Sequence, residues 1–453
     1  MQVTSRNPLK MNKIRIGMLS LGCPKTLVDS ETILGKVVGE QCDLVPSVTD
    51  CDVALLNTCA FIQDAQKESV DRILELIELK KEKRIRALIV MGCLVQRFPK
   101  QLQSELKEVD AFIGSGEYAK IPEIVNRVAK GEHVVSIGVP GYLATSNEAR
   151  IALTPPHYRY LKISEGCDHV CTFCTIPSFR GKHRSRTIED VVTEAKQLVD
   201  DGAKEIILTG QDTSYFGRDL EGAFLLPRLL QELDKISGLE WIRVLYAYPS
   251  CITSEFMEAM RDLEHVCHYL DMPLQHASDR MLLAMKRGIT KRKTMELVEK
   301  FRKTVPDLAI RTTFIVGFPG ETGDDFEELL AFMENVKFER LGIFTYSQEE
   351  GSAAARMPHQ VAEKVKQERL ERAMQLQQEI SKQNNQKWLG KTLQVLVEER
   401  DEKQPGLWIG RSFMDAPEVD GNVFIRTHKE IRPGSFHPVK ITSIKEYDLL
   451  GEL

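Results

Sequence analysis

Six of the ten cysteines in this 453-residue chain fall into two patterns that could hold metal. Cys167, Cys171 and Cys174 lie in the stretch EGCDHVCTFC, at spacings of four and three residues. A loop with these spacings can place three thiolates around one iron–sulfur cluster, whereas structural zinc usually takes four ligands. His169 stands inside the loop, where its spacing suits a fourth ligand poorly. Three thiolates on a four-iron cluster leave one iron open to a substrate or cofactor.

Cys23, Cys59 and Cys93 form a second, dispersed set. They stand 36 and 34 residues apart in the contexts SLGC, LLNTC and VMGC, each just past a short apolar run. If the runs are neighbouring parallel strands, the three thiols converge at the carboxyl edge of a sheet, where ligands commonly bind. The alternative is three buried cysteines at strand–helix corners, because cysteine is among the most often buried residues. Spacing alone leaves both interpretations open, and the four remaining cysteines are interpreted as structural.

Four short apolar runs alternate with helix-length segments over the first 130 residues. The runs are residues 14–20, 53–57, 87–91 and 111–113. Alternation of this kind predicts a parallel sheet covered by helices. A polar stretch with Gly and Pro follows, so the sequence predicts a domain at 12–130 and a linker at 131–156.

A second alternating series follows the linker, with apolar runs at 160–164, 205–209, 242–246, 269–272, 310–316 and 341–346. Six units are fewer than the eight of a closed (βα)8 barrel, so a partial (βα)6 barrel is expected. The charged segment 361–387 contains no Gly or Pro and predicts one long helix, which completes a domain at 157–387. Short strands at 392–398, 407–411, 422–426 and 438–444 predict a small, OB-like β-barrel at 388–453.

Composition narrows the class of protein further. Hydrophobic residues make up 42% and charged residues 28%, which is typical of a globular protein and excludes a disordered chain. The alternating runs described above make its expected fold class α/β. The net charge of −5 gives no overall basic field for nucleic acid. The longest apolar run, residues 87–95, is about half of the ~18 residues needed to cross a bilayer. The first residues lack the apolar core of a secretory signal, so a cytosolic protein with no membrane partner is expected.

Two strand ends carry residues that suit a small cofactor. LTGQD ends the run at 205–209, and Gly210 with Gln211 and Asp212 suits a bound amino-acid group. IVGFPGET ends the run at 310–316, where two glycines allow close backbone approach. A tight turn between strand and helix explains either motif equally well. The basic stretch RGKHRSR, residues 180–186, has two interpretations: a contact with a carboxylate or phosphate, and a solvated face, which is preferred. The chain has no GxGxxG or Walker-type loop, which disfavours nucleoside triphosphate chemistry.

The motif EGCDHVCTFCTIP resembles the cluster-binding loop of the radical S-adenosylmethionine enzymes. Together with SLGCPKTLVDSE, NTCAF and MGCLVQR, nearly the whole chain resembles a methylthiotransferase of that superfamily, with a C-terminal TRAM domain. The resemblance implies two [4Fe-4S] clusters, one held by Cys167, Cys171 and Cys174. The other, auxiliary cluster would be held by the dispersed set, Cys23, Cys59 and Cys93.

Within this family, YLDMPLQHAS, LTGQDTSYFG and YSQEEGSAAA resemble the branch that modifies an aspartate of small-subunit ribosomal protein twelve. One departure is Thr26, where that branch usually has Asn; because it lies off the cysteine, it is expected to matter little. The C-terminal 66 residues carry nine Lys or Arg and eleven Asp or Glu, a net charge of −2. Affinity for tRNA depends on cationic contacts to phosphate, so this charge favours a basic protein substrate.

The resemblance also implies a mechanism. One electron from the reduced cluster cleaves S-adenosylmethionine, and the resulting radical abstracts hydrogen from the aspartate β-carbon, which no protein base can deprotonate at pH 7. Sulfur from sulfide or polysulfide is then delivered at the auxiliary cluster, and a second S-adenosylmethionine supplies the methyl group. The implied partners are the ribosomal protein, within the ribosomal subunit or free, and an electron donor such as flavodoxin or ferredoxin. Gly210, Gln211, Asp212, Arg311 and Glu349 are the candidate S-adenosylmethionine contacts.

Two alternatives remain at this stage. The first is a methylthiotransferase that acts on a tRNA adenosine, which the acidic C-terminal domain and the segment LDMPLQHAS disfavour. The second is a non-catalytic, metal-containing RNA-binding module. It would need a fourth ligand at each metal and a basic surface, and the sequence indicates neither.

Overall fold

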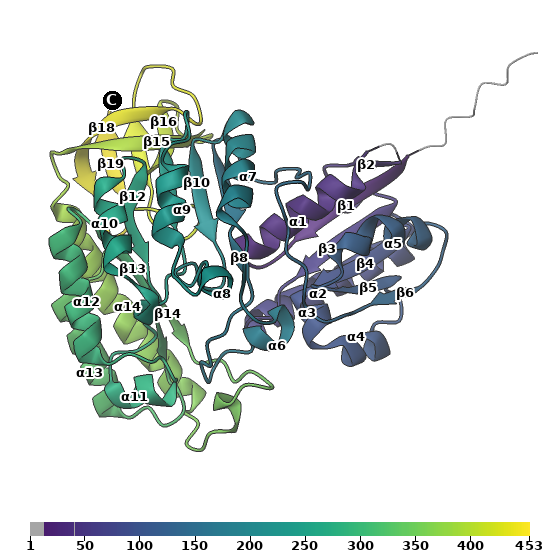
Figure 1. The fold of residues 1–453 in the computed structure, drawn as a ribbon, viewed down its shortest axis with the longest axis horizontal. Helices are drawn as coiled ribbons and strands as arrows, with labels where there is room; N and C mark the ends of the chain where they lie inside the picture. The colour runs from purple at the N-terminus through teal and green to yellow at the C-terminus, as the bar shows by residue number, and fades with distance from the viewer. Residues whose placement is uncertain (1–12, 40) are drawn as a thin grey trace, which may run out of the picture. The chain divides into compact units, whose positions relative to one another are not determined.

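A computed structural model describes residues 13–39 and 41–453, which form two compact units. The first unit comprises the chain up to residue 144 together with the segments 148–153 and 178–180. The second comprises residues 145–147, 154–177 and 181–453. Figure 1 shows the elements of each unit along the chain. None of the described helices is long and apolar enough to cross a membrane.

A six-stranded parallel sheet forms the centre of the first unit, in the order β2-β1-β3-β4-β5-β6. Its strands are β1 (Ile14–Ser20), β2 (Cys42–Leu44), β3 (Val53–Thr58), β4 (Ala87–Gly92), β5 (Ala111–Gly114) and β6 (Val134–Ser136). The predicted strands are all present, and two three-residue edge strands, β2 and β6, were missed because they are too short to show a pattern. Strand β6 lies inside the predicted linker.

Helices cover this sheet, as predicted: α1 (Pro24–Val37), α2 (Gln63–Lys81), α3 (Cys93–Arg97), α4 (Pro99–Glu105) and α5 (Ile121–Val128). The apolar residues of α1 and α5 pack with alternate residues of the strands in one hydrophobic core. Every residue of β3 and β4 is buried, which is the pattern of central parallel strands covered on both faces.

The second unit contains six parallel strands in the order β14-β13-β12-β11-β10-β7, which confirms the predicted partial (βα)6 barrel. They are β7 (Tyr158–Lys162), β10 (Glu205–Thr209), β11 (Trp241–Val244), β12 (Val266–Asp271), β13 (Ala309–Val316) and β14 (Arg340–Thr345). Two-residue strands β8 (Ser164–Glu165) and β9 (Arg184–Ser185) pair separately beside β7. The intervening helices are α6 (Ile176–Arg180), α7 (Ile188–Asp200), α8 (Arg218–Glu221), α9 (Leu226–Leu233), α10 (Ser254–Asp262), α11 (Asp279–Ala284), α12 (Lys291–Thr304) and α13 (Gly323–Val336).

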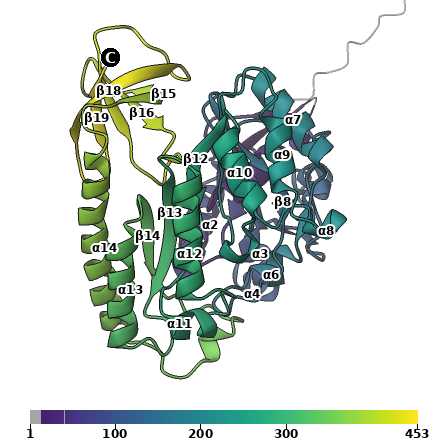
Figure 2. The same ribbon diagram turned by 60° about the vertical axis from the view of Figure 1, so that its left-hand side comes forward.

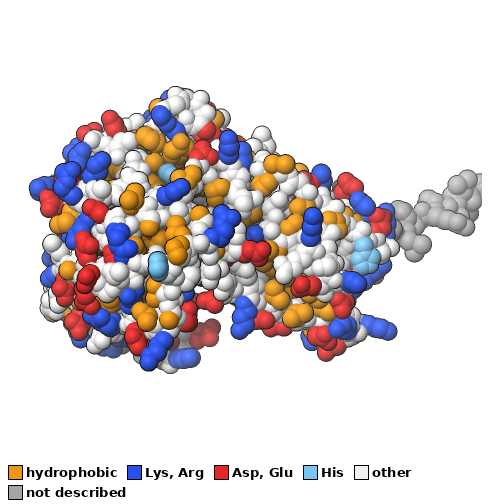
Figure 3. Space-filling view, turned by 90° about the horizontal axis from the view of Figure 1, so that it is seen from below, with side chains coloured by type: hydrophobic (Ala, Val, Ile, Leu, Met, Phe, Trp, Pro, Cys, Tyr) orange, Lys and Arg blue, Asp and Glu red, His pale blue; other side chains and the backbone are white. Residues whose placement is uncertain are grey.

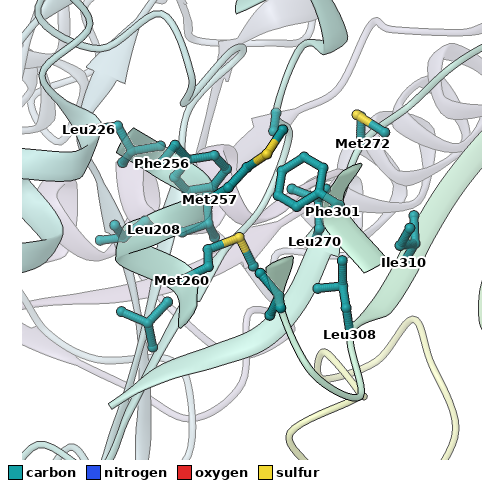
Figure 4. Close-up of a cluster of buried hydrophobic side chains, with 14 of the residues drawn as sticks. Leu208, Leu226, Phe256, Met257, Met260, Leu270, Met272, Phe301, Leu308 and Ile310 are labelled. Carbon is teal, nitrogen blue, oxygen red and sulfur yellow. The ribbon is translucent and has the colours of Figure 1, made fainter. Parts of the chain in front are cut away.

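Threonine residues begin four of these crossover helices. Thr187, Thr253, Thr290 and Thr322 each accept a hydrogen bond from the backbone N–H three residues later, at the starts of α7, α10, α12 and α13. A side-chain cap of this kind typically stabilises a helix by about 1 kcal/mol. Inside the helices, Leu, Met and Phe side chains pack against the strands in one continuous core, which Figure 4 shows around Met257, Met260 and Phe301.

A long helix and a closed barrel complete the second unit. Helix α14 (Glu363–Gln386) agrees with the predicted 361–387 and packs along α13 and β14 (Figure 2). The closed barrel has the order β15-β16-β17-β19-β18, which confirms the predicted small β-barrel. Its strands are β15 (Thr392–Arg400), β16 (Leu407–Ser412), β17 (Val423–Arg426), β18 (Phe436–Ile444) and β19 (Leu449–Glu452), the last of which was not predicted.

Candidate functional site

The dispersed cysteines stand at the carboxyl ends of three adjacent strands, in the order β1-β3-β4. Cys23 follows β1 and caps α1, Cys59 follows β3 directly, and Cys93 is the first residue of α3 after β4. The three thiols lie near one another, because the thiolates of Cys59 and Cys23 both raise the pKa of Cys93 by repulsion of like charge. The structure therefore gathers these three residues in the arrangement that a parallel sheet predicts.

Glycines make the close approach of these cysteines sterically feasible. Gly22 has a φ of +97°, and a Cβ atom there would lie 2.8 Å from the Cβ atom of Cys59. Gly92 has a φ of +100°, and a Cβ atom there would lie 2.3 Å from Oδ1 of Asn57. Both positions need a left-handed backbone and space that only glycine leaves. The repeated Gly-Cys pair was visible in the sequence and is a signal for this turn.

The three thiols differ in their electrostatic environment. Burial raises the pKa of Cys93 to about 12, against the lowering effect of Arg180. Burial also raises the pKa of Cys59, and the neighbouring Cys23 adds to this effect. Burial acts on Cys23 too, but Lys25, the hydrogen bond with Thr26 and Arg180 together lower its pKa below the usual value. A bound metal ion would stabilise all three thiolates, since thiolate is the form that ligates iron.

A buried arginine contacts this set. Arg180 is 4% exposed and donates from Nε and Nη2 to Cys93 Sγ, at 3.2 and 3.0 Å. Its Nη1 donates to Asp29 Oδ2 at 2.8 Å. The interpretation of residues 180–186 as a solvated face was wrong: His183 is buried, and Arg186 is buried between Asp190 and Glu194. The basic side chains turn inward because carboxylates pair with them, from distant Asp29 on α1 for Arg180 and from the neighbouring helix α7 for Arg186.

The second cysteine set lies in one loop after β8. Gly166 has a φ of +83°, and a Cβ atom there would lie 2.0 Å from the carbonyl oxygen of Lys182. The N–H of Cys167 donates to the carbonyl of Gly181 at 3.1 Å, which fixes the start of the loop. Burial raises the pKa of Cys167 to about 12, and the thiolates of Cys174 and Cys171 contribute to the rise. The three thiols of the loop therefore lie near enough to affect the pKa of Cys167.

Donors surround the sulfur atoms of this loop. Arg287 Nη1 donates to Cys171 Sγ at 3.3 Å, and the N–H of Ile176 donates to Cys174 Sγ at 3.4 Å. The hydroxyl of Tyr248 lies 3.9 Å from Cys171 Sγ, and the Arg287 guanidinium lies 4.1 Å from the Tyr248 ring centroid. Hydrogen bonds to sulfur are characteristic of thiolate ligands of iron–sulfur clusters, so these residues fit such a group.

The contacts of His169 are not those expected of a fourth ligand of the cluster. Its Nε2 lies 2.6 Å from Asp212 Oδ2, and its ring stacks on Tyr248 at 3.6 Å between centroids. Cys251 has its sulfur within 4.8 Å of the same His–Asp pair. The second oxygen of Asp212 accepts from Ser214, so hydrogen bonds already engage both carboxylate oxygens.

The residues predicted to bind S-adenosylmethionine around Gly210 lie at the carboxyl end of β10, beside this loop. A Cβ atom at Gly210 would lie 2.6 Å from Ser164 Oγ, so only glycine fits there. Gln211 donates from Nε2 to Glu165 at 2.6 Å, while its Oε1 is buried without a hydrogen-bond partner in the described chain. Ser164 Oγ and Thr209 Oγ1 are buried and unpartnered in the same way. Buried polar atoms normally find partners, so this strand edge fits a polar ligand.

The other two candidates lie elsewhere. Glu349 is buried in the loop after β14 and accepts a hydrogen bond from Ser347 at 2.6 Å. Arg311, the third residue of β13, forms ion pairs with Asp271 at 3.0 Å and with Asp420 of the C-terminal barrel at 3.3 Å. A role of Arg311 in joining the barrel to β13 was not apparent from the sequence. Binding of S-adenosylmethionine by these residues stays a prediction.

The glycines of IVGFPGET form the turn between β13 and α13. Gly317 has a φ of +74°, and a Cβ atom there would lie 2.3 Å from Lys366 Cγ on α14. Thr322 and Asp325 then cap each other at the start of α13. Of the two interpretations of this motif, the tight turn packed against a helix accounts for both of its glycines.

Sequence reasoning missed Arg180, Arg287 and Tyr248 as neighbours of cysteine sulfur, because nothing in their local sequence indicates such a partner. Thr26 was also misjudged. Its Oγ1 lies 3.4 Å from Cys23 Sγ, so it does contact the cysteine, one helical turn into α1. The spacing of three residues from Cys23 is a signal that could have shown this contact.

Three family models match the chain. The Radical SAM superfamily matches residues 161–333, the TRAM domain matches residues 389–453, and a family described as uncharacterized protein family UPF0004 matches residues 15–114. The first model spans the loop of Cys167, Cys171 and Cys174, and the third spans Cys23, Cys59 and Cys93.

Relatives and solved structures agree with these matches. The chain is 48% identical over 439 residues to the ribosomal protein uS12 methylthiotransferase RimO of Pelotomaculum thermopropionicum, covering 97% of this chain and 99% of that protein. It is 44% identical over 442 residues to the protein of the same name from Geobacter sulfurreducens, covering 97% and 99%. The fold resembles the radical S-adenosylmethionine methyltransferase TsrM of Kitasatospora setae, with a TM-score of 0.54 at 12% identity over 74% of this chain and 72% of that one. The chain therefore belongs to the RimO family of radical S-adenosylmethionine methylthiotransferases.

Proposed function

We propose that this protein methylthiolates the β-carbon of an aspartate in ribosomal protein uS12. The observation that carries this function is the full-length identity of 48% to a RimO protein, whose name describes a methylthiotransferase of ribosomal protein uS12. The radical SAM domain implies one [4Fe-4S] cluster and S-adenosylmethionine. A second, auxiliary cluster on Cys23, Cys59 and Cys93 is supported by the mutual electrostatic influence of their thiols.

The chain's own residues have separate tasks at the radical site. When bound, the cluster and S-adenosylmethionine supply the one-electron chemistry that removes hydrogen from an unactivated carbon. Cys167, Cys171 and Cys174 would hold that cluster, and the N–H of Ile176 and the guanidinium of Arg287 orient two of the sulfur atoms. The unpartnered oxygens of Ser164, Thr209 and Gln211 would bind the polar groups of S-adenosylmethionine.

At the auxiliary site, Cys23, Cys59 and Cys93 would hold the second cluster, and sulfide or polysulfide would be the source of the inserted sulfur. An electron donor such as flavodoxin or ferredoxin would supply the electrons. We further propose that the substrate, uS12, is modified either as part of the small ribosomal subunit or as the free protein before assembly. The donor, the sulfur source and the ribosomal context belong to this proposal.

Charge on the C-terminal barrel supports a protein substrate less strongly than the sequence indicated. Arg411, Asp415 and Asp420 are buried in ion pairs with the (βα)6 barrel. Without them, the domain has eight Lys or Arg and nine Asp or Glu, which is nearly neutral. The barrel therefore lacks the basic excess that tRNA would need. On the face of the molecule in Figure 3, Lys and Arg side chains are interspersed with Asp and Glu side chains.

Mass spectrometry of uS12 and of bulk tRNA from a strain lacking this gene tests the proposal. We expect uS12 to lose a mass of about 46 Da, since the family's reaction replaces hydrogen with a methylthio group. Reintroducing the wild-type chain should restore the mass, whereas a Cys171→Ala chain should not. A strain whose uS12 keeps its mass while its tRNA loses methylthio-adenosine would show that the substrate is tRNA.

A further inference from the structure

Arg180 donates hydrogen bonds to one auxiliary cysteine, Cys93, and to the carboxylate of Asp29. Nε and Nη2 lie 3.2 and 3.0 Å from Cys93 Sγ, and Nη1 lies 2.8 Å from Oδ2 of Asp29. The side chains of Arg180 and Asp29 are 5% and 1% exposed. Two parallel N–H groups on one sulfur form a fork that holds the sulfur in a set direction.

The segment that presents Arg180 is itself anchored in the first unit. Residues 178–180 belong to that unit, although they follow the radical SAM loop by a few residues along the chain. Ser115, just after β5, donates from its hydroxyl to the carbonyl of Phe179 at 2.8 Å. Phe179 is 2% exposed, so a buried ring and a hydrogen bond position the residue next to Arg180. Helix α6 ends at Arg180, because Gly181 takes a φ of +77°.

The charge of Arg180 acts on the whole auxiliary set. Its positive charge lowers the pKa of Cys23 and of Cys59 as well as that of Cys93. Asp29 lies on the other side of the guanidinium and opposes this charge in part. The pair therefore places the cation of Arg180 next to the sulfur of Cys93 and the anion of Asp29 on the other side of the guanidinium group.

We propose that Arg180 is a positioning residue that orients Cys93 and raises the reduction potential of the auxiliary cluster, and that Asp29 moderates this effect. The inference rests on the proposed function only in that it requires a cluster on Cys23, Cys59 and Cys93. One-electron reduction adds a negative charge to a cluster that three thiolates already make anionic. A desolvated cation that donates to one of the sulfur atoms stabilises the reduced form, because hydrogen bonds and local charge set cluster potentials.

A purely structural ion pair is the competing explanation, and the chain contains a matched example. Arg150 pairs with Glu31, two residues beyond Asp29 on α1, with side-chain exposures of 9% and 2%. Arg180 acts on the auxiliary thiols through its hydrogen bonds to Cys93 and through its charge, whereas the charge of Arg150 is paired with Glu31. Loss of Arg150 should therefore perturb α1 as loss of Arg180 does, without changing the cluster's potential.

The test measures the potential of the auxiliary cluster in the full-length chain with Cys167, Cys171 and Cys174 replaced by Ala. Each variant is reconstituted anaerobically with iron and sulfide and titrated with dithionite under electron paramagnetic resonance. At a fixed potential, Arg180→Gln should lower the ratio of reduced to oxidised cluster at least tenfold, a shift of about 59 mV to more negative potential. Asp29→Asn should shift the potential in the opposite direction. Arg180→Lys should recover part of the loss, because it keeps the charge without the fork, and Arg150→Gln should match the parent.

Shifts of the same sign in Arg180→Gln and Asp29→Asn, or shifts no larger than that of Arg150→Gln, would overturn the proposal. The proposed function would then still stand, provided that the parent binds about four irons. A parent that binds no iron would instead refute the auxiliary cluster, and with it this inference. In the reciprocal background, with Cys23, Cys59 and Cys93 replaced by Ala, Arg180→Gln should leave the potential of the radical cluster unchanged. A matching shift there would show that Arg180 does not act on the auxiliary site specifically.

Discussion

Glu205 of β10 and Arg411 of β16 form an ion pair of 2.6 Å in which both side chains are almost fully buried. The other oxygen of Glu205 accepts from Arg243 Nε, also at 2.6 Å. Arg243 continues the contact by donating to the carbonyl of Phe413 in the C-terminal barrel. One carboxylate thus joins the (βα)6 barrel to the β-barrel through two arginines. Burial opposes ionisation of Glu205, but Arg411 and Arg243 lower its pKa below the usual value.

Replacing Glu205 with Gln should destabilise the second unit by about 3–5 kcal/mol, because it leaves two buried guanidinium groups without their carboxylate. The midpoint of urea unfolding, followed by circular dichroism, measures the effect. Glu296→Gln is a suitable control, since Glu296 forms only an exposed pair with Arg292 on α12. An unchanged midpoint in Glu205→Gln would show that this charge network does not contribute to stability.

Replacing Cys59 with Ala should remove the auxiliary cluster and leave the radical cluster in place. Iron content after reconstitution should fall from about eight to about four per chain, since each [4Fe-4S] cluster holds four irons. Cys42→Ala provides the control, because Cys42 is a buried cysteine of the same sheet that belongs to neither set. Full iron content and full methylthiolation by Cys59→Ala would contradict the two-cluster arrangement.

Replacing Gly22 with Ala should also reduce auxiliary iron, for a steric reason. The added methyl group would lie 2.8 Å from the Cβ atom of Cys59 and force the two strand ends apart. Gly131→Ala separates this effect from backbone strain, because Gly131 has a similar φ of +90° and no atom within 4 Å of its Cβ position. We expect Gly22→Ala to lose about four irons, measured by colorimetric iron assay, and Gly131→Ala to lose none. Equal losses of iron in both variants would show that backbone strain alone causes the effect.

His183 should make the second unit less stable as pH falls below about 6.5, the pKa of an unperturbed histidine. Burial lowers the pKa of His183, against the raising effect of Asp219, so the folded chain binds its proton less readily than the unfolded chain. The contribution is therefore fully present above pH 6.5 and is lost as pH falls toward the folded-state pKa. Urea midpoints at pH 8 and pH 5.5 should differ less in His183→Gln than in the wild type. The exposed His133→Gln should keep the wild-type difference, and a His183→Gln chain that also keeps it would rule out this source of pH dependence.

Local patterns were sufficient for most of the fold. The six strands of the (βα)6 barrel and helix α14 follow from apolar runs and helical spacing, because these periodicities are properties of neighbouring residues. Strands β2, β6 and β19, of three or four residues each, were missed. They are stabilised by pairing with distant strands, such as β17 with β19.

The sequence by itself determined the two cysteine sets and the class of chemistry, because the spacing of the cysteines and the alternation of apolar runs with helical segments follow directly from the order of residues. Only the tertiary structure decided which side chains meet the sulfur atoms. Arg180 reaches Cys93 across 87 residues, and Arg287 reaches Cys171 across 116. The same basic stretch could have been a solvated surface, and it became buried because Asp29, Asp190 and Glu194 are folded against it. The Arg186–Asp190 pair follows a local spacing of four residues, whereas the Arg180–Asp29 pair, 151 residues apart, depends on which elements pack together.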